Sequence, residues 1–258
     1  MTRFIPGRRE GLLLLIVFVF FDYCCSGPRS GAARQGYAPC RETQPAAEQA
    51  TLFSKTNSCK AALTAIAIAA ADGREHALSF GRDPRGTIIR SAVSNGTSNS
   101  TIAPAISNRF ADLHNHPENR PPSSGDLYHF IDQATATSGT YQKFILLPDG
   151  TVYALVLACL QDAADFNKHF PRRAGIHDTA AGRRYQPTFP GTLTEEINQL
   201  KGWGGASEEA ALAFILQKYK AGIALLKKNP DGHFRRIYTI EQLQKDGTRS
   251  YQTRSCPD

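Results

Sequence analysis

The stretch Asp112-Leu113-His114-Asn115-His116-Pro117, followed closely by Ser123-Ser124-Gly125-Asp126, decides how we interpret this sequence. Side chains at positions i and i+2 of an extended strand point to the same side, so two imidazoles share one face of a strand end. Asp126 falls in the first turn of a helix that Ser123 can begin. A strand end followed by a helix start therefore brings two imidazoles and a carboxylate together.

These three side chains are of the types that bind zinc. Three nitrogen or oxygen ligands leave the fourth tetrahedral position to water, which is typical of a catalytic zinc site and not of a structural one. We therefore predict that His114, His116 and Asp126 are metal ligands of a metallohydrolase. Ser123-x-x-Asp126 is also a helix-capping pattern, and both roles are compatible because a capping carboxylate keeps lone pairs for a metal.

The same residues resemble a known signature. The order Glu, His-x-His-Pro and Ser-x-x-Asp is similar to that of the JAMM (JAB/MPN) zinc metallopeptidases, in which the Glu lies on an upstream strand. The matching positions are Glu75, His114, His116, Pro117, Ser123 and Asp126. The resemblance covers about residues 46–160, and its His116 to Asp126 spacing is one position shorter than is common in that family.

The resemblance implies a fold, a cofactor and an activity. It implies an α/β fold with an MPN-like mixed sheet flanked by helices, and zinc as the cofactor. Glu75 would be the general base and Ser123 would hydrogen-bond the developing oxyanion. The substrate would be a peptide or protein conjugate, such as a cell-wall peptide or a host protein conjugate, cut at a peptide or isopeptide bond. Two alternatives stay open: a noncatalytic MPN-like binding module, and a secreted metal-dependent toxin or effector module.

Two other families share parts of the motif. Asp-Leu-His-x-His resembles the first strand of amidohydrolase-type barrels, but a (β/α)₈ barrel takes about 250 residues. Only Pro117 to Asp258 follow the motif, which is too short. HNH nucleases spread their three residues over a longer ββα unit, so the contiguous His-Asn-His fits them poorly.

The N-terminus has the pattern of a signal peptide over residues 1–27. Three arginines at positions 3, 8 and 9 precede an apolar run from Leu12 to Phe21, and small or polar residues follow. No later run approaches the roughly 20 apolar residues of a membrane span, so we expect no transmembrane segment in the mature chain. The protein is then secreted or periplasmic. Cys24 and Cys25 keep lipoprotein anchoring as an alternative, although Tyr23 does not fit a lipobox.

Export also bears on the cysteines that follow the signal peptide, Cys40, Cys59, Cys159 and Cys256. An even number in an oxidising compartment predicts up to two disulfides, with three possible pairings. Cys40 and Cys256 lie outside the proposed catalytic domain at opposite ends of the chain. We expect a bond between them, whereas Cys59 and Cys159 can equally be small buried residues.

The formal net charge of +7 does not indicate a nucleic-acid substrate. The basic residues occur as scattered pairs, Arg172-Arg173, Arg183-Arg184 and Arg235-Arg236, without interleaved aromatic side chains for base stacking. We predict no specific nucleic-acid partner.

The chain divides, on this interpretation, into a signal peptide (1–27), a linker (28–45), the JAMM/MPN-like domain (46–170), an irregular linker (171–191) and a smaller C-terminal α+β appendage (192–258). Periodicity and turn residues predict helices over 59–71, 124–136, 162–170, 192–200 and 207–220. They predict strands over 75–81, 87–93, 109–113, 141–147, 151–159, 223–227 and 234–240.

Overall fold

The computed structural model describes residues 38–179 and 182–257, which belong to one compact unit. The predicted signal peptide and the first part of the predicted linker lie outside these residues. The elements are α1 (Ala38–Ser54), α2 (Asn57–Ala69), η1 (Ala70–Asp72), β1 (His76–Arg82), β2 (Ile88–Arg90), β3 (Ser94–Asn95), β4 (Ala111–Asn115), α3 (Ser124–Ala136), β5 (Gln142–Leu146), β6 (Val152–Leu157), α4 (Leu160–His169), β7 (Arg173–Thr179), β8 (Gly182–Thr188), α5 (Gly191–Gly202), α6 (Glu208–Lys218), β9 (Ile223–Lys228), β10 (Phe234–Leu243) and β11 (Arg249–Ser255).

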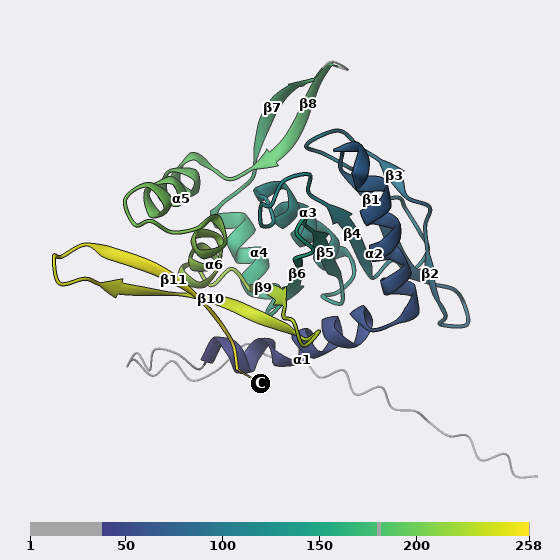
Figure 1. The fold of residues 1–258 in the computed structure, drawn as a ribbon, viewed down its shortest axis with the longest axis horizontal. Coiled ribbons are helices and arrows are strands. Elements are labelled where there is room, and N and C mark those ends of the chain that lie inside the picture. Colours follow the sequence, from purple (N-terminus) through teal and green to yellow (C-terminus); the bar gives the residue numbers. More distant parts are fainter. Residues whose placement is uncertain (1–37, 180–181, 258) are drawn as a thin grey trace, which may run out of the picture. The chain divides into compact units, whose positions relative to one another are not determined.

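A large mixed sheet forms the centre of this unit (Figure 1). Its strand order is β11-β10-β9-β6-β5-β4-β1-β2, and β3 pairs with β1. Only β4 and β5 pair in parallel among the described strands, and α3 connects them as a crossover. The predicted α/β class, a mixed sheet flanked by helices, is confirmed.

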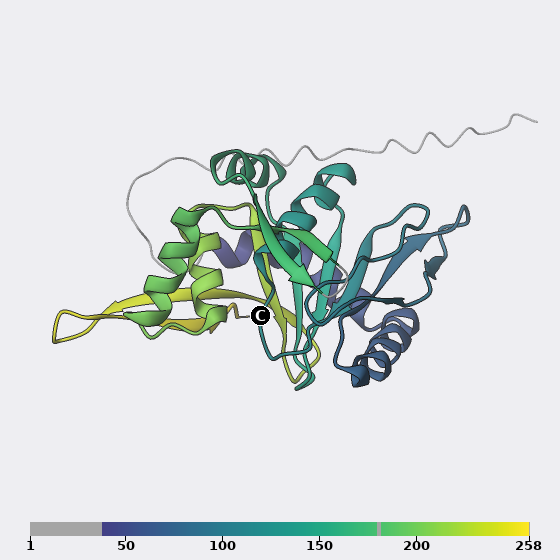
Figure 2. The ribbon, with the colours of Figure 1, turned by 90° about the horizontal axis from the view of Figure 1, so that it is seen from above.

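Helices cover both faces of the sheet (Figure 2). Leu113 and Phe144 pack with residues of α1 and α2 in one core, whereas Ile145 packs with residues of α3, α4 and α6 in the other. Full burial of a side chain such as Phe144 contributes roughly 2 to 3 kcal/mol. His114 pairs in register with Ile145, so its side chain lies on the α3 face.

Helix α3 begins and ends where the sequence predicts. Ser123 is its N-cap, with φ −82° and ψ 170°, and its hydroxyl accepts a hydrogen bond from the backbone N–H of Asp126. Leu127, Phe130 and Ile131 follow the i, i+3, i+4 spacing of one helix face and are buried in the core beneath α3. This packing fixes the first turn of α3 against the end of β4.

Two turns lie near the site. Gly73 ends η1, which directly follows α2, with φ 75°, a conformation that glycine adopts without strain. The segment from Pro148 to Gly150 connects β5 and β6 as a hairpin. The first turn leads into β1, and the second sets how β6 pairs with β5.

The first described helix corrects the predicted linker. We expected irregular chain up to Pro45, but α1 begins at Ala38 and contains that proline. The helix forms despite its local composition because its apolar residues pack in the core and Cys40 bonds to the distant Cys256. The expected Cys40–Cys256 disulfide is confirmed, with Cα atoms 5.5 Å apart, and it fixes the start of α1 to the chain after β11.

The segment 171–191 is not irregular as predicted, since β7 and β8 pair over Arg173–Thr179 and Gly182–Thr188. Backbone hydrogen bonds form this ladder without the apolar alternation that marks a strand in a sequence. Strand β11 escaped prediction for the same reason. Strands β9 and β10 extend the main sheet through β6, while the predicted division into domains stays a prediction.

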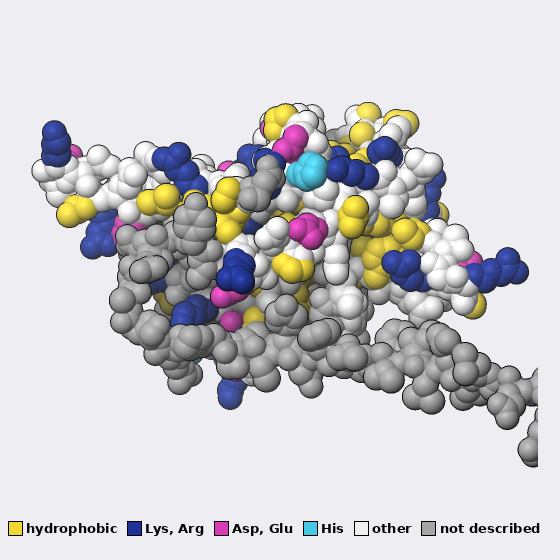
Figure 3. Space-filling view, turned by 90° about the horizontal axis from the view of Figure 1, so that it is seen from below, with side chains coloured by type: hydrophobic (Ala, Val, Ile, Leu, Met, Phe, Trp, Pro, Cys, Tyr) yellow, Lys and Arg dark blue, Asp and Glu magenta, His cyan; other side chains and the backbone are white. Residues whose placement is uncertain are grey.

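Two further properties of the described part of the chain concern membrane-spanning helices and the distribution of surface charge. Among the described residues, no helix combines the length and apolar character that crossing a bilayer requires. On the face seen in Figure 3, the visible Lys and Arg side chains lie in separate groups and not in one continuous stripe.

Candidate metal centre

The three predicted ligands converge where β4 ends and α3 begins. His114 Nε2 lies 3.0 Å from Asp126 Oδ1, and His116 Nε2 lies 3.1 Å from Asp126 Oδ2. The two imidazole nitrogens are 3.2 Å apart. All three residues are buried, so these atoms face one another away from bulk water.

This triangle has the size of a metal site. Zinc bonds of about 2.0 to 2.1 Å to His or carboxylate ligands place neighbouring ligands of a tetrahedron roughly 3.3 Å apart. The observed separations of 3.0 to 3.2 Å are close to that edge. Within the described part of the chain, His114, His116 and Asp126 form a group able to hold a metal ion. Its donors, two nitrogens and one carboxylate, suit zinc.

The imidazole of His116 is also held in place by a backbone contact on its side away from Asp126. His116 Nδ1 lies 2.9 Å from the backbone carbonyl oxygen of Arg120, so the N–H must be on Nδ1 for this hydrogen bond to form. In the neutral imidazole that would ligate a metal, the Nε2 lone pair then points at the site, which is how ligating histidines are usually held. His114 Nδ1 is buried and has no hydrogen-bond partner among the described residues.

Asp126 combines the capping role with the predicted ligand position. Its Oδ2 accepts hydrogen bonds from the backbone N–H and the hydroxyl of Ser123, both at 2.8 Å. Together with the return bond from the Asp126 backbone N–H, these contacts make a complete capping box. The carboxylate is therefore fixed before any metal binds, and Oδ1 has the fewer protein donors.

The charges of the three groups are coupled. Burial alone would raise the pKa of Asp126, but the charge and hydrogen bond of His114 and the hydrogen bond of His116 hold it well below its usual value. Burial and the positive charge of Lys143 lower the pKa of His114. Burial would also lower the pKa of His116, yet its hydrogen bond and attraction to Asp126 raise it.

Glu75 immediately precedes β1, beside the end of β4. Asn115 fixes the backbone on both sides of it: its side-chain oxygen accepts from the N–H of His76 at 2.8 Å, and its amide donates to the carbonyl of Arg74 at 2.9 Å. Gly96 donates to the carbonyl of Glu75, where an added Cβ would come within 2.7 Å of that oxygen. The middle residue of His-Asn-His thus positions the predicted base.

Glu75 has the electrostatic properties of a proton acceptor near neutral pH. Burial raises its pKa to about 7, because the charge of His116 only partly offsets that burial. The negative charge of Asp126 also contributes to the increase. A carboxyl group with a pKa near the working pH is well matched to general acid–base catalysis.

A buried charge cluster behind the ligands was not anticipated from the sequence. Asp112 is fully buried and accepts hydrogen bonds from Arg109 at 2.8 Å and the Tyr141 hydroxyl at 2.5 Å. Lys143 Nζ lies 3.4 Å from Asp112 Oδ1 and 3.7 Å from Asp126 Oδ1. The signal in the sequence was a lysine inside a mostly apolar strand.

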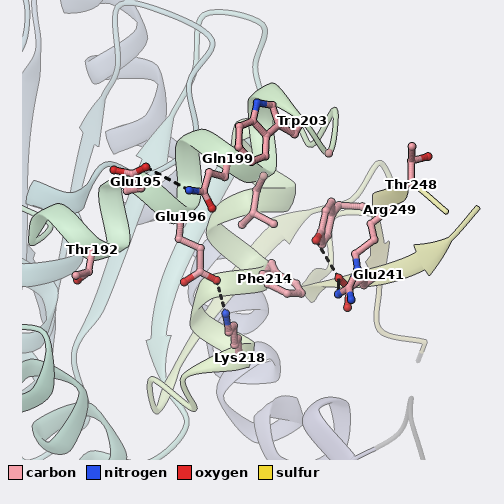
Figure 4. A pocket seen from close by; sticks show the side chains of 13 residues that line it. Thr192, Glu195, Glu196, Gln199, Trp203, Phe214, Lys218, Glu241, Thr248 and Arg249 are labelled. Carbon is pink, nitrogen blue, oxygen red and sulfur yellow. Dashed lines mark hydrogen bonds and ion pairs between the residues drawn. The ribbon is translucent and has the colours of Figure 1, made fainter.

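A cavity of about 510 Å³ opens onto the metal centre, and Glu75, His116 and Ser123 line it. A larger cavity of about 890 Å³ lies between α5, α6 and the β10–β11 hairpin (Figure 4). Its carboxylates are engaged with neighbouring side chains, as the pairs Glu196–Lys218 and Glu241–Arg249 in Figure 4 show. The converging ligands belong to the smaller cavity, where we place the candidate site.

Comparison with known proteins identifies no relative: no protein-family model matches this chain, and no curated protein or solved structure is significantly similar to it. The resemblance to the JAMM metallopeptidases therefore depends on the motif residues alone and stays a prediction.

Proposed function

We propose that this protein is an exported, JAMM-like zinc-dependent hydrolase of peptide or isopeptide bonds. The observation that carries the proposal is the convergence of His114, His116 and Asp126, together with a cavity that both His116 and Glu75 line. Two imidazoles and one carboxylate with a neighbouring carboxyl base are the donor set of catalytic zinc hydrolases.

The metal and the protein would divide the chemistry between them. When bound, zinc supplies Lewis acidity, which lowers the pKa of a coordinated water to about 7 and polarises a carbonyl group. Glu75 would accept a proton from the attacking water and pass it to the leaving amine. The raised pKa of Glu75 and its fixed backbone support this assignment.

Ser123 has a hydroxyl group that is already in use. It donates to Asp126 Oδ2, so stabilising an oxyanion would require the hydroxyl to turn toward the cavity. Its position on the cavity wall beside the ligands supports that second role. We assign capping as the main role of Ser123 and oxyanion binding as an additional role.

One observation favours the alternative, a noncatalytic binding module without metal. The ammonium group of Lys143 already lies near Asp126 Oδ1, and it supplies positive charge that a metal would otherwise provide. The complete ligand set and the buried Glu75 carboxyl favour the enzyme.

The test compares activity in variants that keep the metal with those that lose it. Zinc-loaded wild type is incubated with quenched-fluorescent peptides that contain either an α-linked or an ε-linked lysine bond. We expect cleavage, a loss of at least about 100-fold in Glu75→Gln with zinc still bound, and loss of both activity and zinc in His116→Ala.

The matched control is Glu48→Gln, because Glu48 is an exposed glutamate on α1. It should cleave like wild type. Cleavage by Glu75→Gln at the wild-type rate would refute the assignment of the base, and a zinc-loaded wild type that cuts neither bond type would favour the binding module.

A further inference from the structure

The cavity at the metal centre extends beyond the residues of the motif. Its wall includes Glu75 and His116, and also Ile197 of α5 and Leu212 of α6. A molecule held at the metal centre therefore meets the C-terminal helices, for which the sequence indicates no chemistry.

The charges along this cavity cancel in pairs. Arg120 Nε lies 2.7 Å from Glu118 Oε2, and Lys201 Nζ lies 2.6 Å from Glu208 Oε1. Apart from Glu75 and the metal ligands, these four are the charged side chains that line the cavity within the described residues. Such exposed pairs add little stability, but they leave no net charge to attract a polyanion or a polycation.

Part of the cavity wall is apolar. Phe189, Ile197 and Leu212 line it and pack against the core beneath α3 and α6. The ring of Phe189 meets Tyr128 edge to face, with centroids 5.8 Å apart, which fixes its position. Thr194 and Asn198 line the same wall and are exposed, so they offer hydrogen bonds to an amide backbone.

We propose that α5 and α6 form the specificity wall of this enzyme, and that its substrate carries an uncharged segment with a large apolar side chain beside the bond that is cut. This inference rests on the proposed function, since the metal centre anchors one end of the substrate. The apolar side chain would lie on Phe189, Ile197 and Leu212, and the paired charges would leave the rest of the segment uncharged.

Hydroxamates test this wall without requiring catalysis, because the hydroxamate group chelates zinc. Acetohydroxamate, N-acetyl-leucine hydroxamate and N-acetyl-aspartate α-hydroxamate are titrated into the zinc-loaded protein by calorimetry. Burying most of a leucine side chain should make the leucine compound bind about tenfold or more tighter than acetohydroxamate. The aspartate compound should gain nothing.

A matched pair of variants locates the effect. Ile197→Asn should reduce the leucine advantage to less than about threefold. Ile68→Asn is the control, because Ile68 lies on α2 with 71% of its surface exposed and should keep the full advantage. The wild-type comparison stands even if Ile197→Asn does not fold.

The two failures are distinguishable. If acetohydroxamate binds and the leucine compound binds no tighter, the apolar wall is overturned while the metal centre stands. If acetohydroxamate does not bind to a chain that also takes up no zinc, the proposed function fails and this inference fails with it.

Discussion

Glu75→Gln should make the metal-free protein more stable at alkaline pH. Burial raises the pKa of Glu75 from 4.5 to about 7, so the folded protein favours the protonated carboxyl. Below pH 4.5 the group costs nothing, the cost grows as pH rises from 4.5 to 7, and above pH 7 it is constant. The shift corresponds to about 3 kcal/mol, which we reduce to about 1 to 2 kcal/mol because Glu75 is partly exposed.

The assay is urea unfolding in the presence of a chelator, at pH 4.5 and at pH 8. The free energy of unfolding of Glu75→Gln should exceed that of wild type by about 1 to 2 kcal/mol at pH 8 and equal it at pH 4.5. Glu48→Gln should match wild type at both values. A difference of the same size at both pH values, or a less stable Glu75→Gln at pH 8, would refute the claim that this carboxylate is desolvated in the folded state.

Three further changes should lower stability by different mechanisms. The Cys40→Ala, Cys256→Ala double variant opens a loop that spans 216 positions, and the chain-entropy estimate of about 5 kcal/mol predicts a loss of about 3 to 5 kcal/mol in urea unfolding. Lys143→Met removes one of the cations beside the buried carboxylates of Asp112 and Asp126 and should cost about 3 kcal/mol in the metal-free protein, whereas Lys218→Met at an exposed pair should cost less than about 1 kcal/mol. Ser123→Ala removes a helix cap and should cost about 1 kcal/mol, seen as a lower melting temperature.

Local patterns predicted the part of the chain that carries the candidate site. Helix α3 was predicted over 124–136 from its cap and apolar spacing, and both agree with the structure. The alternation of side chains along a strand predicted that His114 and His116 share one face. A strand that leads into a helix predicted that both converge with Asp126. These relations lie within about fifteen residues, where spacing determines geometry.

Contacts between segments that are distant in the sequence could not be predicted from local patterns. The placement of Glu75 depends on the side chain of Asn115 and on the antiparallel pairing of β1 with β4. The charge cluster around Asp112 depends on the register that sets Lys143 beside it in β5. Strands such as β7 and β11, which carry few apolar residues, show no alternation, so only the folded chain reveals them.

The most direct test of the metal centre is the zinc content of the purified protein, measured by mass spectrometry. We expect about one zinc per chain in wild type and none in His116→Ala. His233→Ala removes an exposed histidine outside the site and should keep the wild-type content. Zinc bound equally by all three proteins, or a folded wild type that holds none after dialysis against zinc, would contradict the metal centre and with it the hydrolase.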